Sequence, residues 1–202
     1  MNNIIADSTN EMYRWFDILN EKYFNNSLSR PVITIQKTRK NNLGHFTLDK
    51  VWTDVENEEG MFYEINIASQ SLNRDINEIV GTLLHECVHF WNRVNDIKDC
   101  SGNIHNKKFK KKAEEVGLIV TKGKSVGWGY TTNSDELNEF ITNTIKPNKE
   151  VFQYYCSFPM KQKVANKTSF KYVCPGCGMK VRAKNGYSIM CGACQLELNM
   201  EE

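Results

Sequence analysis

The feature that most constrains the fold is a His-Glu-x-x-His motif, formed by His85, Glu86 and His89 inside an apolar run. Apolar residues around the motif recur at helical spacing, and they are Ile76, Ile79, Val80, Leu83, Leu84, Val88 and Phe90. This pattern predicts a half-buried helix over residues 75–94. Residues four apart lie one turn apart on a helix, so both imidazoles project toward a common point. Packed, hydrogen-bonded histidines are the alternative, but the helical context favours a zinc site with Glu86 beside it as general base.

A third metal ligand has to come from elsewhere, because a catalytic zinc normally has three protein ligands and one open position. The two histidines outside the motif are His45 and His105. His105 follows a polar segment, residues 95–103, which predicts a loop able to return the chain to the metal helix. We expect His105 to be the third ligand, with Asp99 and Cys100 in the same region as alternatives. His45 lies among apolar residues of a predicted strand, and we expect it to be structural or exposed.

The segments before the motif predict one helix and three strands. Apolar residues at helical spacing predict a helix over residues 9–25. Alternating patterns predict strands over 32–36, 43–48 and 61–68, the first two paired across a basic turn. We expect the third strand to offer an edge for an extended peptide. Short connections between the strands favour an α+β fold, with helices packed on a small sheet of three to four strands.

The segments after the motif predict two more helices. A lysine-rich helix is expected over residues 106–116, with Gly117 as its C-terminal stop. Leu118–Val120 predicts a short strand, and residues 135–144 predict a short helix. Pro147-Asn148-Lys149 is the best candidate boundary, which gives a first domain over 1–148 and a second over 149–202.

The second domain contains two Cys-x-x-Cys pairs, formed by Cys174, Cys177, Cys191 and Cys194. Pairs spaced in this way predict a closed tetrahedral zinc site of four thiolates, which is structural rather than catalytic. We expect strands over 169–173 and 180–183 to pair around the first knuckle, as in a small β zinc ribbon. So short a unit buries little apolar surface, so bound metal must supply its folding free energy.

Composition limits the class of protein. The chain has 202 residues, a mass of 23.4 kDa and a net charge of +2, which suits one domain with a small appendage. Its longest apolar runs are too short to span a membrane, and residues 1–7 lack the features of a signal peptide. We therefore expect a cytoplasmic protein, in which paired cysteines favour metal binding over disulfides.

The run from Asn10 to Leu118, which contains the His-Glu-x-x-His motif, resembles the SprT-like (Spartan-related) family of zinc metalloproteases. The similar segments are Leu19–Phe24, Leu43–Phe46, Ile67–Ser69, Thr82–His89, His105–Phe109 and Glu115–Leu118. The resemblance covers about the first 120 residues, and a zinc ribbon often follows in such proteins. It implies a zincin-like fold, zinc ligands at His85, His89 and His105, and a catalytic glutamate at Glu86. Asn106 follows the third histidine, where the family usually has a nearby glycine.

The activity expected from these residues is hydrolysis of peptide bonds in protein substrates, with one catalytic and one structural zinc ion. Glu86 would take a proton from the attacking water, and Tyr130 is a candidate donor to the developing oxyanion. A non-enzymatic zinc-ribbon protein that binds DNA or acts as an adaptor is the alternative. A zinc hydrolase of a small molecule stays open as a third interpretation.

The resemblance also raises DNA, and proteins attached to it, as expected partners. Basic residues cluster after the third histidine and in the second domain; they are Lys107, Lys108, Lys110, Lys111, Lys112, Lys122, Lys124, Lys161, Lys163, Lys167, Lys171, Lys180, Arg182 and Lys184. Aromatic residues among them are candidates for stacking on bases: Phe109, Trp128, Phe170, Tyr172 and Tyr187. A run of lysines is often only a solvated surface, so the aromatic residues carry this expectation.

Overall fold

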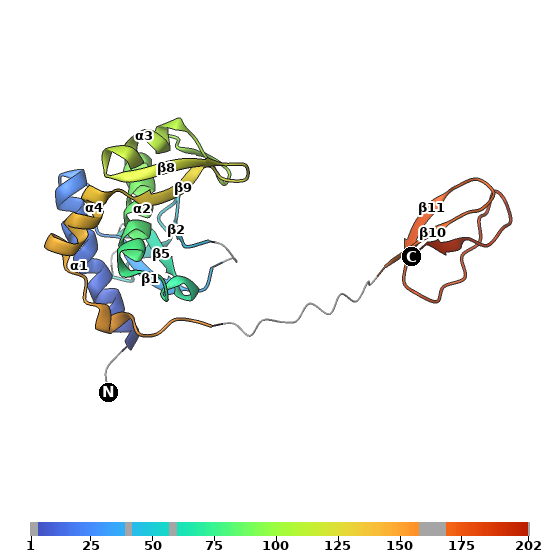
Figure 1. Cartoon of the computed structure of the whole chain (residues 1–202), viewed down its shortest axis with the longest axis horizontal. Coiled ribbons are helices and arrows are strands. Elements are labelled where there is room, and N and C mark those ends of the chain that lie inside the picture. The colour runs from blue at the N-terminus through green and yellow to red at the C-terminus, as the bar shows by residue number, and fades with distance from the viewer. Residues whose placement is uncertain (1–3, 39–41, 57–59, 158–168, 202) are drawn as a thin grey trace. The chain divides into compact units, whose positions relative to one another are not determined.

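The structure is a computed structural model that describes residues 4–38, 42–56, 60–157 and 169–201. Its chain divides into two compact units, Met1–Phe158 and Pro159–Glu202, which are described separately below (Figure 1). The first unit combines helices with small sheets, and the second is a small β unit, so the predicted α+β class is confirmed. Among the described helices, none combines the length and apolarity that crossing a bilayer requires.

Helix α1, Ile4–Phe24, buries an apolar face made of Met12, Trp15, Phe16 and Leu19. The prediction began this helix at residue 9, but tertiary contacts extend it toward the N-terminus. The Ser8 hydroxyl donates to the Val151 carbonyl, and the Trp15 ring stacks on Phe152 with centroids 4.9 Å apart. Val151 and Phe152 both lie in the 3-10 turn η3, Lys149–Phe152, which therefore belongs to the first unit.

The first sheet has the strand order β1-β5-β2, where β1 is Val32–Gln36, β2 is Gly44–Phe46 and β5 is Glu64–Ala68. Strand β5 pairs in parallel with β1 and antiparallel with β2. The predicted pairing of the first two strands is therefore wrong, and so is the predicted edge at 61–68. The last four residues of β5 are all buried, which suits the central position of a sheet covered by helices.

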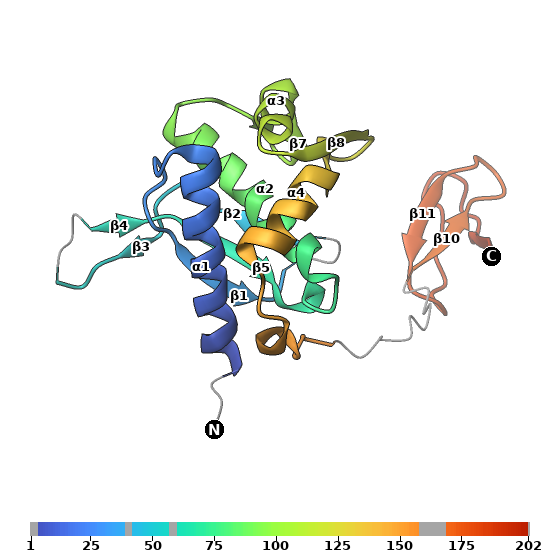
Figure 2. The same ribbon diagram turned by 60° about the vertical axis from the view of Figure 1, so that its left-hand side comes forward.

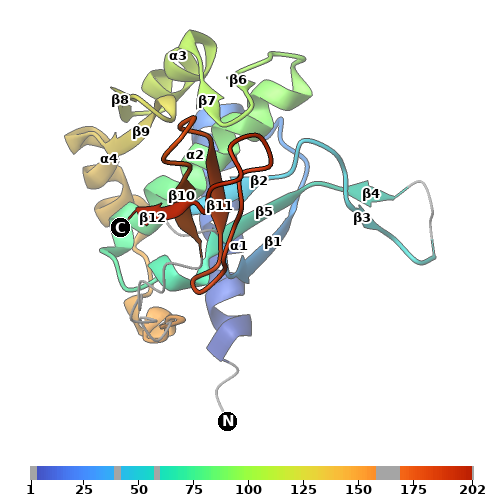
Figure 3. The same ribbon diagram turned by 90° about the vertical axis from the view of Figure 1, so that its right-hand side faces the viewer.

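The predicted strand over 61–68 is two strands in the structure. Its first residues form β4, Met61–Phe62, which pairs with β3, Trp52–Thr53, in a separate hairpin. Figures 2 and 3 show this hairpin projecting from the first sheet. Its outer residues include Trp52 and Phe62, both of which are exposed.

Helix α2, Ile76–Val94, carries the His-Glu-x-x-His motif and confirms the predicted helix. Asp75 caps its N-terminus by accepting a hydrogen bond from the Asn77 backbone N–H, after the short 3-10 turn η1, Ser69–Ser71. The helix packs against α1, β2 and β5 (Figure 2). Its buried side chains form the main core with those of α1 and β5. The motif is thereby fixed on a rigid element.

The C-terminal half of this unit forms a second sheet, with the strand order β6-β7-β9-β8. Its strands are β6 Cys100–Ser101, β7 Ile104–His105, β8 Leu118–Gly123 and β9 Gly127–Asn133. The helices are α3 Lys107–Glu115, α4 Asp135–Phe140 and the π-helical turn η2 Ile141–Ile145. Gly117 has φ +90, as its predicted role as helix stop requires. Strand β9 was not predicted, because its residues Gly127–Asn133 lack an alternating apolar pattern.

The second unit confirms the predicted strands beside the first Cys-x-x-Cys pair. Strand β10, Phe170–Val173, pairs with β11, Lys180–Ala183, and on its other side with β12, Asn199–Glu201, which was not predicted. Residues 149–157, assigned to the second domain from the sequence, lie in the first unit in this structure. The functional division into a metalloprotease domain and a ribbon domain stays a prediction.

Candidate active site

Three imidazoles meet at one point of the first unit. His85 and His89 come from α2, and His105 comes from β7. The Nε2 atom of His105 lies 3.3 Å from Nε2 of His85 and 3.0 Å from Nε2 of His89. Nitrogen ligands about 2.0–2.1 Å from a tetrahedral zinc ion would be separated by about 3.3 Å. The fold thus brings the three histidines predicted as ligands together, at nitrogen separations that suit zinc.

The opposite nitrogen of each ring contacts a protein acceptor. Nδ1 of His85 lies 2.9 Å from the Thr131 hydroxyl, and Nδ1 of His105 lies 3.1 Å from the Val126 carbonyl oxygen. A ring that donates its Nδ1 proton directs the lone pair of Nε2 toward the shared point. Three converging lone pairs without a proton between them repel one another, so this donor set fits a cation.

Asp99 orients the ring of His89 in the same way. Its carboxylate lies 2.7 Å from Nδ1 of His89 and also accepts a hydrogen bond from Asn92. Burial raises the pKa of Asp99, but the hydrogen bonds from His89 and Asn92 outweigh it and lower the pKa overall. Asp99 was a rival for the third ligand position, but it contacts the outer nitrogen of a ring. This role was missed from the sequence, where a lone acidic residue near a candidate ligand was the only signal.

Two of the rings are held in the neutral form that a metal ligand requires. Burial, together with the neighbouring imidazoles, lowers the pKa of His85 well below its usual value. Burial and His89 lower the pKa of His105 to about 4. Cys100, the other rival, lies beside Asp99, and burial with that carboxylate raises the pKa of its thiol to about 12. The Cys100 thiol clusters with His89 and Asp99 and is not part of the cluster formed by His85, His89 and His105.

Phe109 of α3 supports all three rings from one side. Its ring centroid lies 4.7 Å from that of His85, 4.6 Å from His89 and 4.5 Å from His105. Phe109 is fully buried, so it is not available to stack on a nucleic-acid base as predicted. Tyr172 of the second unit is buried as well and is excluded for the same reason.

Two glycines of β9 make room for His105. A Cβ atom at Gly129 would lie 2.4 Å from Nδ1 of His105, which is closer than such atoms approach. A Cβ atom at Gly127 would lie 2.3 Å from the His105 carbonyl oxygen, and Gly127 has φ +60. The Gly-x-Gly spacing was the available sequence signal, and it was missed because β9 itself was not predicted.

Glu86 lies beside the three rings and is buried, with 5% of its surface exposed. One carboxylate oxygen lies 3.0 Å from the position a Cβ atom would take at Gly44 of β2, and the Phe46 backbone N–H binds the carboxylate. Burial raises the pKa of Glu86 to about 7. A carboxyl group with that pKa exchanges protons readily near neutral pH, as a general base must.

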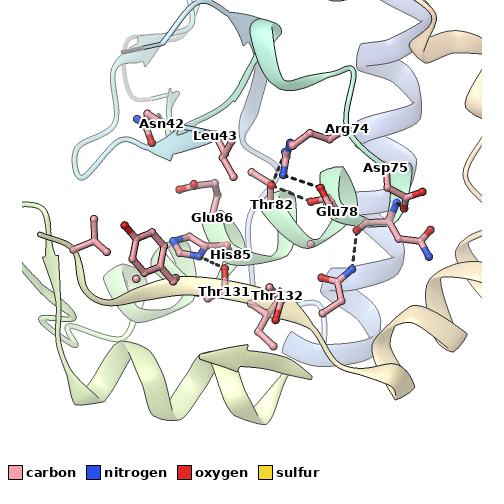
Figure 4. A pocket seen from close by; sticks show the side chains of 18 of the residues that line it. Asn42, Leu43, Arg74, Asp75, Glu78, Thr82, His85, Glu86, Thr131 and Thr132 are labelled. Carbon is pink, nitrogen blue, oxygen red and sulfur yellow. Dashed lines mark hydrogen bonds and ion pairs between the residues drawn. The ribbon is translucent and has the colours of Figure 1, made fainter. Parts of the chain in front are cut away.

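The site opens into a cavity of about 850 Å³. Its lining includes His85, Glu86 and His105, together with Tyr130, and it continues toward the N-terminus of α2 (Figure 4). His45 is exposed and is not among the cavity residues, in agreement with the expectation that it is not a ligand.

The second unit contains the other predicted cluster. Potential ligand atoms of Cys174, Cys177, Cys191 and Cys194 all lie within 4.8 Å of one another, and all four cysteines are unpaired. The Gly178 and Gln195 backbone N–H groups return to the carbonyls of Cys174 and Cys191, forming a tight turn at each pair. Four converging sulfurs with no disulfide among them fit a structural zinc ion.

The lysines after His105 lie mainly on α3 and on the β8–β9 hairpin. Lys110 and Lys122 flank the half-buried ring of Trp128, with Nζ atoms 4.6 and 5.7 Å from its centroid. Lys161, Lys163 and Lys167 lie outside the described residues.

Comparison with known proteins agrees with this geometry. The model of the SprT-like family matches residues 12–126, which is more than half of the 202-residue chain. No curated protein matches the chain. The matched range contains α2, β7 and all three histidines of the site. The chain belongs to the SprT-like family of metallopeptidase-type domains.

Proposed function

We propose that this protein is a zinc-dependent endopeptidase that hydrolyses peptide bonds of protein substrates. The observation that carries the proposal is the convergence of three Nε2 atoms, from His85, His89 and His105, next to a cavity lined by His85, His105 and the carboxylate of Glu86. His85, His89 and His105 would hold the catalytic zinc, and the four cysteines of the second unit would hold a structural one.

Each protein group then has a defined task. When held by the three histidines, zinc would lower the pKa of a bound water molecule and would polarise the scissile carbonyl. Glu86 accepts the proton of the attacking water and returns it to the leaving amine nitrogen. Asp99, through His89, holds one ligand ring in its orientation. Tyr130 lines the cavity with more than half of its surface exposed, and it is our candidate donor to the oxyanion.

The free edge of β2 is the candidate binding site for the substrate backbone. Among the described strands, β2 pairs only with β5, and its residue Gly44 lines the cavity beside Glu86. An extended peptide adding to this edge would pass Glu86 closely, because Gly44 has no side chain to separate them.

DNA-associated or DNA-crosslinked proteins are the substrates that we propose. Lysines on α3 and around Trp128 would bind phosphates, and the exposed Tyr187 of the second unit is available for stacking. Lys171, Lys180, Arg182 and Lys184 add positive charge on the second unit. All seven cysteines are unpaired, which fits the reducing cytoplasm, including its nucleoid.

A non-enzymatic adaptor or DNA-binding protein is the second candidate. The exposed lysines fit it equally well, but a purely structural zinc site has no use for a buried Glu86 in an open cavity. Glu86 therefore favours the enzyme.

Cleavage of DNA-bound proteins by the parent and by Glu86→Gln tests the proposal. Both proteins are first shown to contain equal zinc, and each is incubated with a substrate panel, with and without DNA. We expect the variant to lose at least about 100-fold in rate. Glu21→Gln, at an exposed position of α1, is the matched control and should cut like the parent. Equal cleavage by Glu86→Gln and the parent would contradict the mechanism.

A further inference from the structure

The cavity at the active site extends well beyond the groups that the proposed chemistry uses. Beyond Glu86 and Thr82 its lining continues to Arg74, just before the start of α2. Figure 4 shows Arg74 and Thr82 following Glu86 along this side of the cavity. A substrate side chain next to the scissile bond would therefore meet this end of the cavity.

Arg74 is held in place by its neighbours. Its Nε donates to the Ser71 carbonyl oxygen at 3.0 Å, and its Nη2 donates to the Thr82 hydroxyl at 2.9 Å. That hydroxyl in turn donates to the Glu78 carbonyl at 3.0 Å, so the three groups form one chain of hydrogen bonds. The guanidinium is thereby oriented before any ligand arrives.

The site lies close to the catalytic glutamate. The position a Cβ atom would take at Gly44 is 3.0 Å from Oε1 of Glu86 and 3.3 Å from the methyl carbon of Thr82. Thr82, the hydrogen-bond partner of Arg74, therefore lies beside both Glu86 and the edge strand β2. A peptide on β2 would pass within side-chain reach of Arg74.

The positive charge of Arg74 is only weakly compensated. Its side chain is 21% exposed, and its one ion-pair partner among the described residues is Glu78, at 3.8 Å from Nη1. Glu78 is itself 61% exposed, and 3.8 Å is too long for a hydrogen bond. The neighbouring Asp75 carboxylate caps α2 through the Asn77 N–H instead. Arg74 lines the cavity, and among the described residues Nη1 has no acceptor within hydrogen-bond distance.

Burial further disfavours the weakly compensated positive charge of Arg74. Removal from water lowers the pKa of Arg74, and the charge of Glu78 offsets this only in part. A guanidinium remains charged in proteins, so an incompletely solvated one gains from a second carboxylate. Its two terminal nitrogens match the two oxygens of a carboxylate.

We propose that Arg74 is a specificity-determining residue that binds the carboxylate of an acidic substrate side chain, glutamate or aspartate, next to the scissile bond. This inference rests on the proposed function in that it assumes a peptide in the cavity. It concerns binding and not the chemical step, so it is testable on protein that does not cut.

Peptide binding to zinc-loaded Glu86→Gln tests the inference. The probes are fluorescent peptides that are uncharged apart from one glutamate, which is placed at each position in turn. Matched peptides carry glutamine or lysine at the same position. Fluorescence anisotropy gives the affinity of each. We expect one position at which glutamate binds about tenfold more tightly than glutamine, and lysine more weakly than either. This preference should weaken at high salt.

Variants at Arg74 assign the preference to that residue. In the Glu86→Gln background, Arg74→Gln should abolish the glutamate preference, and Arg74→Lys should keep part of it because the charge remains. Arg93→Gln is the matched control, since Arg93 lies in the last turn of α2 and donates to the Leu48 carbonyl oxygen and to Asp49, none of which line the cavity. It should keep the full preference.

Two results would overturn the inference. One is that zinc-loaded Glu86→Gln binds the glutamate and glutamine peptides with equal affinity at every position. That result does not depend on how any Arg74 variant folds. The other is a glutamate preference that persists in Arg74→Gln. Binding with the expected preference but without cleavage by the Glu86-intact protein would leave the inference standing and count against the proposed activity alone.

Discussion

Gly129 of β9 lies directly against the ring of His105, where a Cβ atom would come within 2.4 Å of Nδ1. The same Cβ atom would also lie 2.9 Å from the carbonyl oxygen of Val126, which is the acceptor for that Nδ1. The glycine therefore sets both the position of the third imidazole and the hydrogen bond that fixes its tautomer.

Gly129→Ala is expected to displace His105 and weaken zinc binding at the three-histidine site by about 10- to 100-fold. Competition with a zinc-binding dye measures the affinity. Thr121→Ala, at an exposed position of the neighbouring strand β8, is the control and should bind zinc like the parent. Unchanged zinc affinity in Gly129→Ala would show that the ring is free to move.

Asp99→Asn is expected to lower zinc affinity by about tenfold or more while the fold is kept. An amide cannot accept the His89 proton as strongly as a carboxylate, so the ring loses orientation and basicity. Asp96 lies in the same connection, and among the described residues it makes no hydrogen bond to a ligand ring, so Asp96→Asn should bind zinc like the parent. The same dye competition measures both variants, and equal affinities would remove Asp99 from the site.

Cys191→Ser is expected to remove one zinc ion per chain and to unfold the second unit, because four thiolates close that site. The second unit has only a small core, which includes Cys174, Cys191, Tyr172 and Leu198. Metal analysis and hydrogen exchange over residues 169–201 measure the two effects. Cys156→Ser, at an exposed cysteine of the first unit, should change neither. Full zinc content in Cys191→Ser would contradict the assignment.

Glu11→Gln is expected to destabilise the first unit at pH 7 by about 1–2 kcal/mol. Glu11 accepts hydrogen bonds from Arg14, Trp15 and the Asn148 backbone N–H, which joins α1 to the end of this unit. Burial raises the pKa of Glu11, but these hydrogen bonds outweigh it, so the pKa lies below its usual 4.5.

The pH dependence of that difference follows from the sign of the shift. The folded state binds the proton less tightly than the unfolded state, so this stabilisation is complete above the unfolded pKa of 4.5. It is lost as the pH falls below 4.5 and through the lower folded pKa. Urea unfolding of the parent and Glu11→Gln between pH 7 and pH 3 should show the two curves converging. A constant gap across this range would contradict the account.

The sequence predicted the elements whose signals are local. The α2 pattern, the His-Glu-x-x-His spacing and the two Cys-x-x-Cys pairs each depend on neighbours within one turn or one knuckle. Strand order was predicted wrongly, because pairing of β1 with β5 rather than β2 depends on which strand is buried from both sides. No local pattern records that choice.

The supporting residues of the site were missed for a related reason. Phe109 stands among lysines and was predicted as a candidate for stacking on bases, yet α3 places it against three imidazoles. Asp99 and Gly129 act only through contacts with rings distant in sequence. Such roles become visible once the fold brings the segments together.

Zinc content per chain tests the central claim most directly. The parent, loaded and then dialysed, is predicted to hold two zinc ions, one of which a chelator removes more readily because its site is open. His105→Ala is predicted to hold one, with the readily removed ion lost and the second unit still folded. Two tightly held ions in His105→Ala, or a single ion in the parent, would contradict a zinc site formed by His85, His89 and His105.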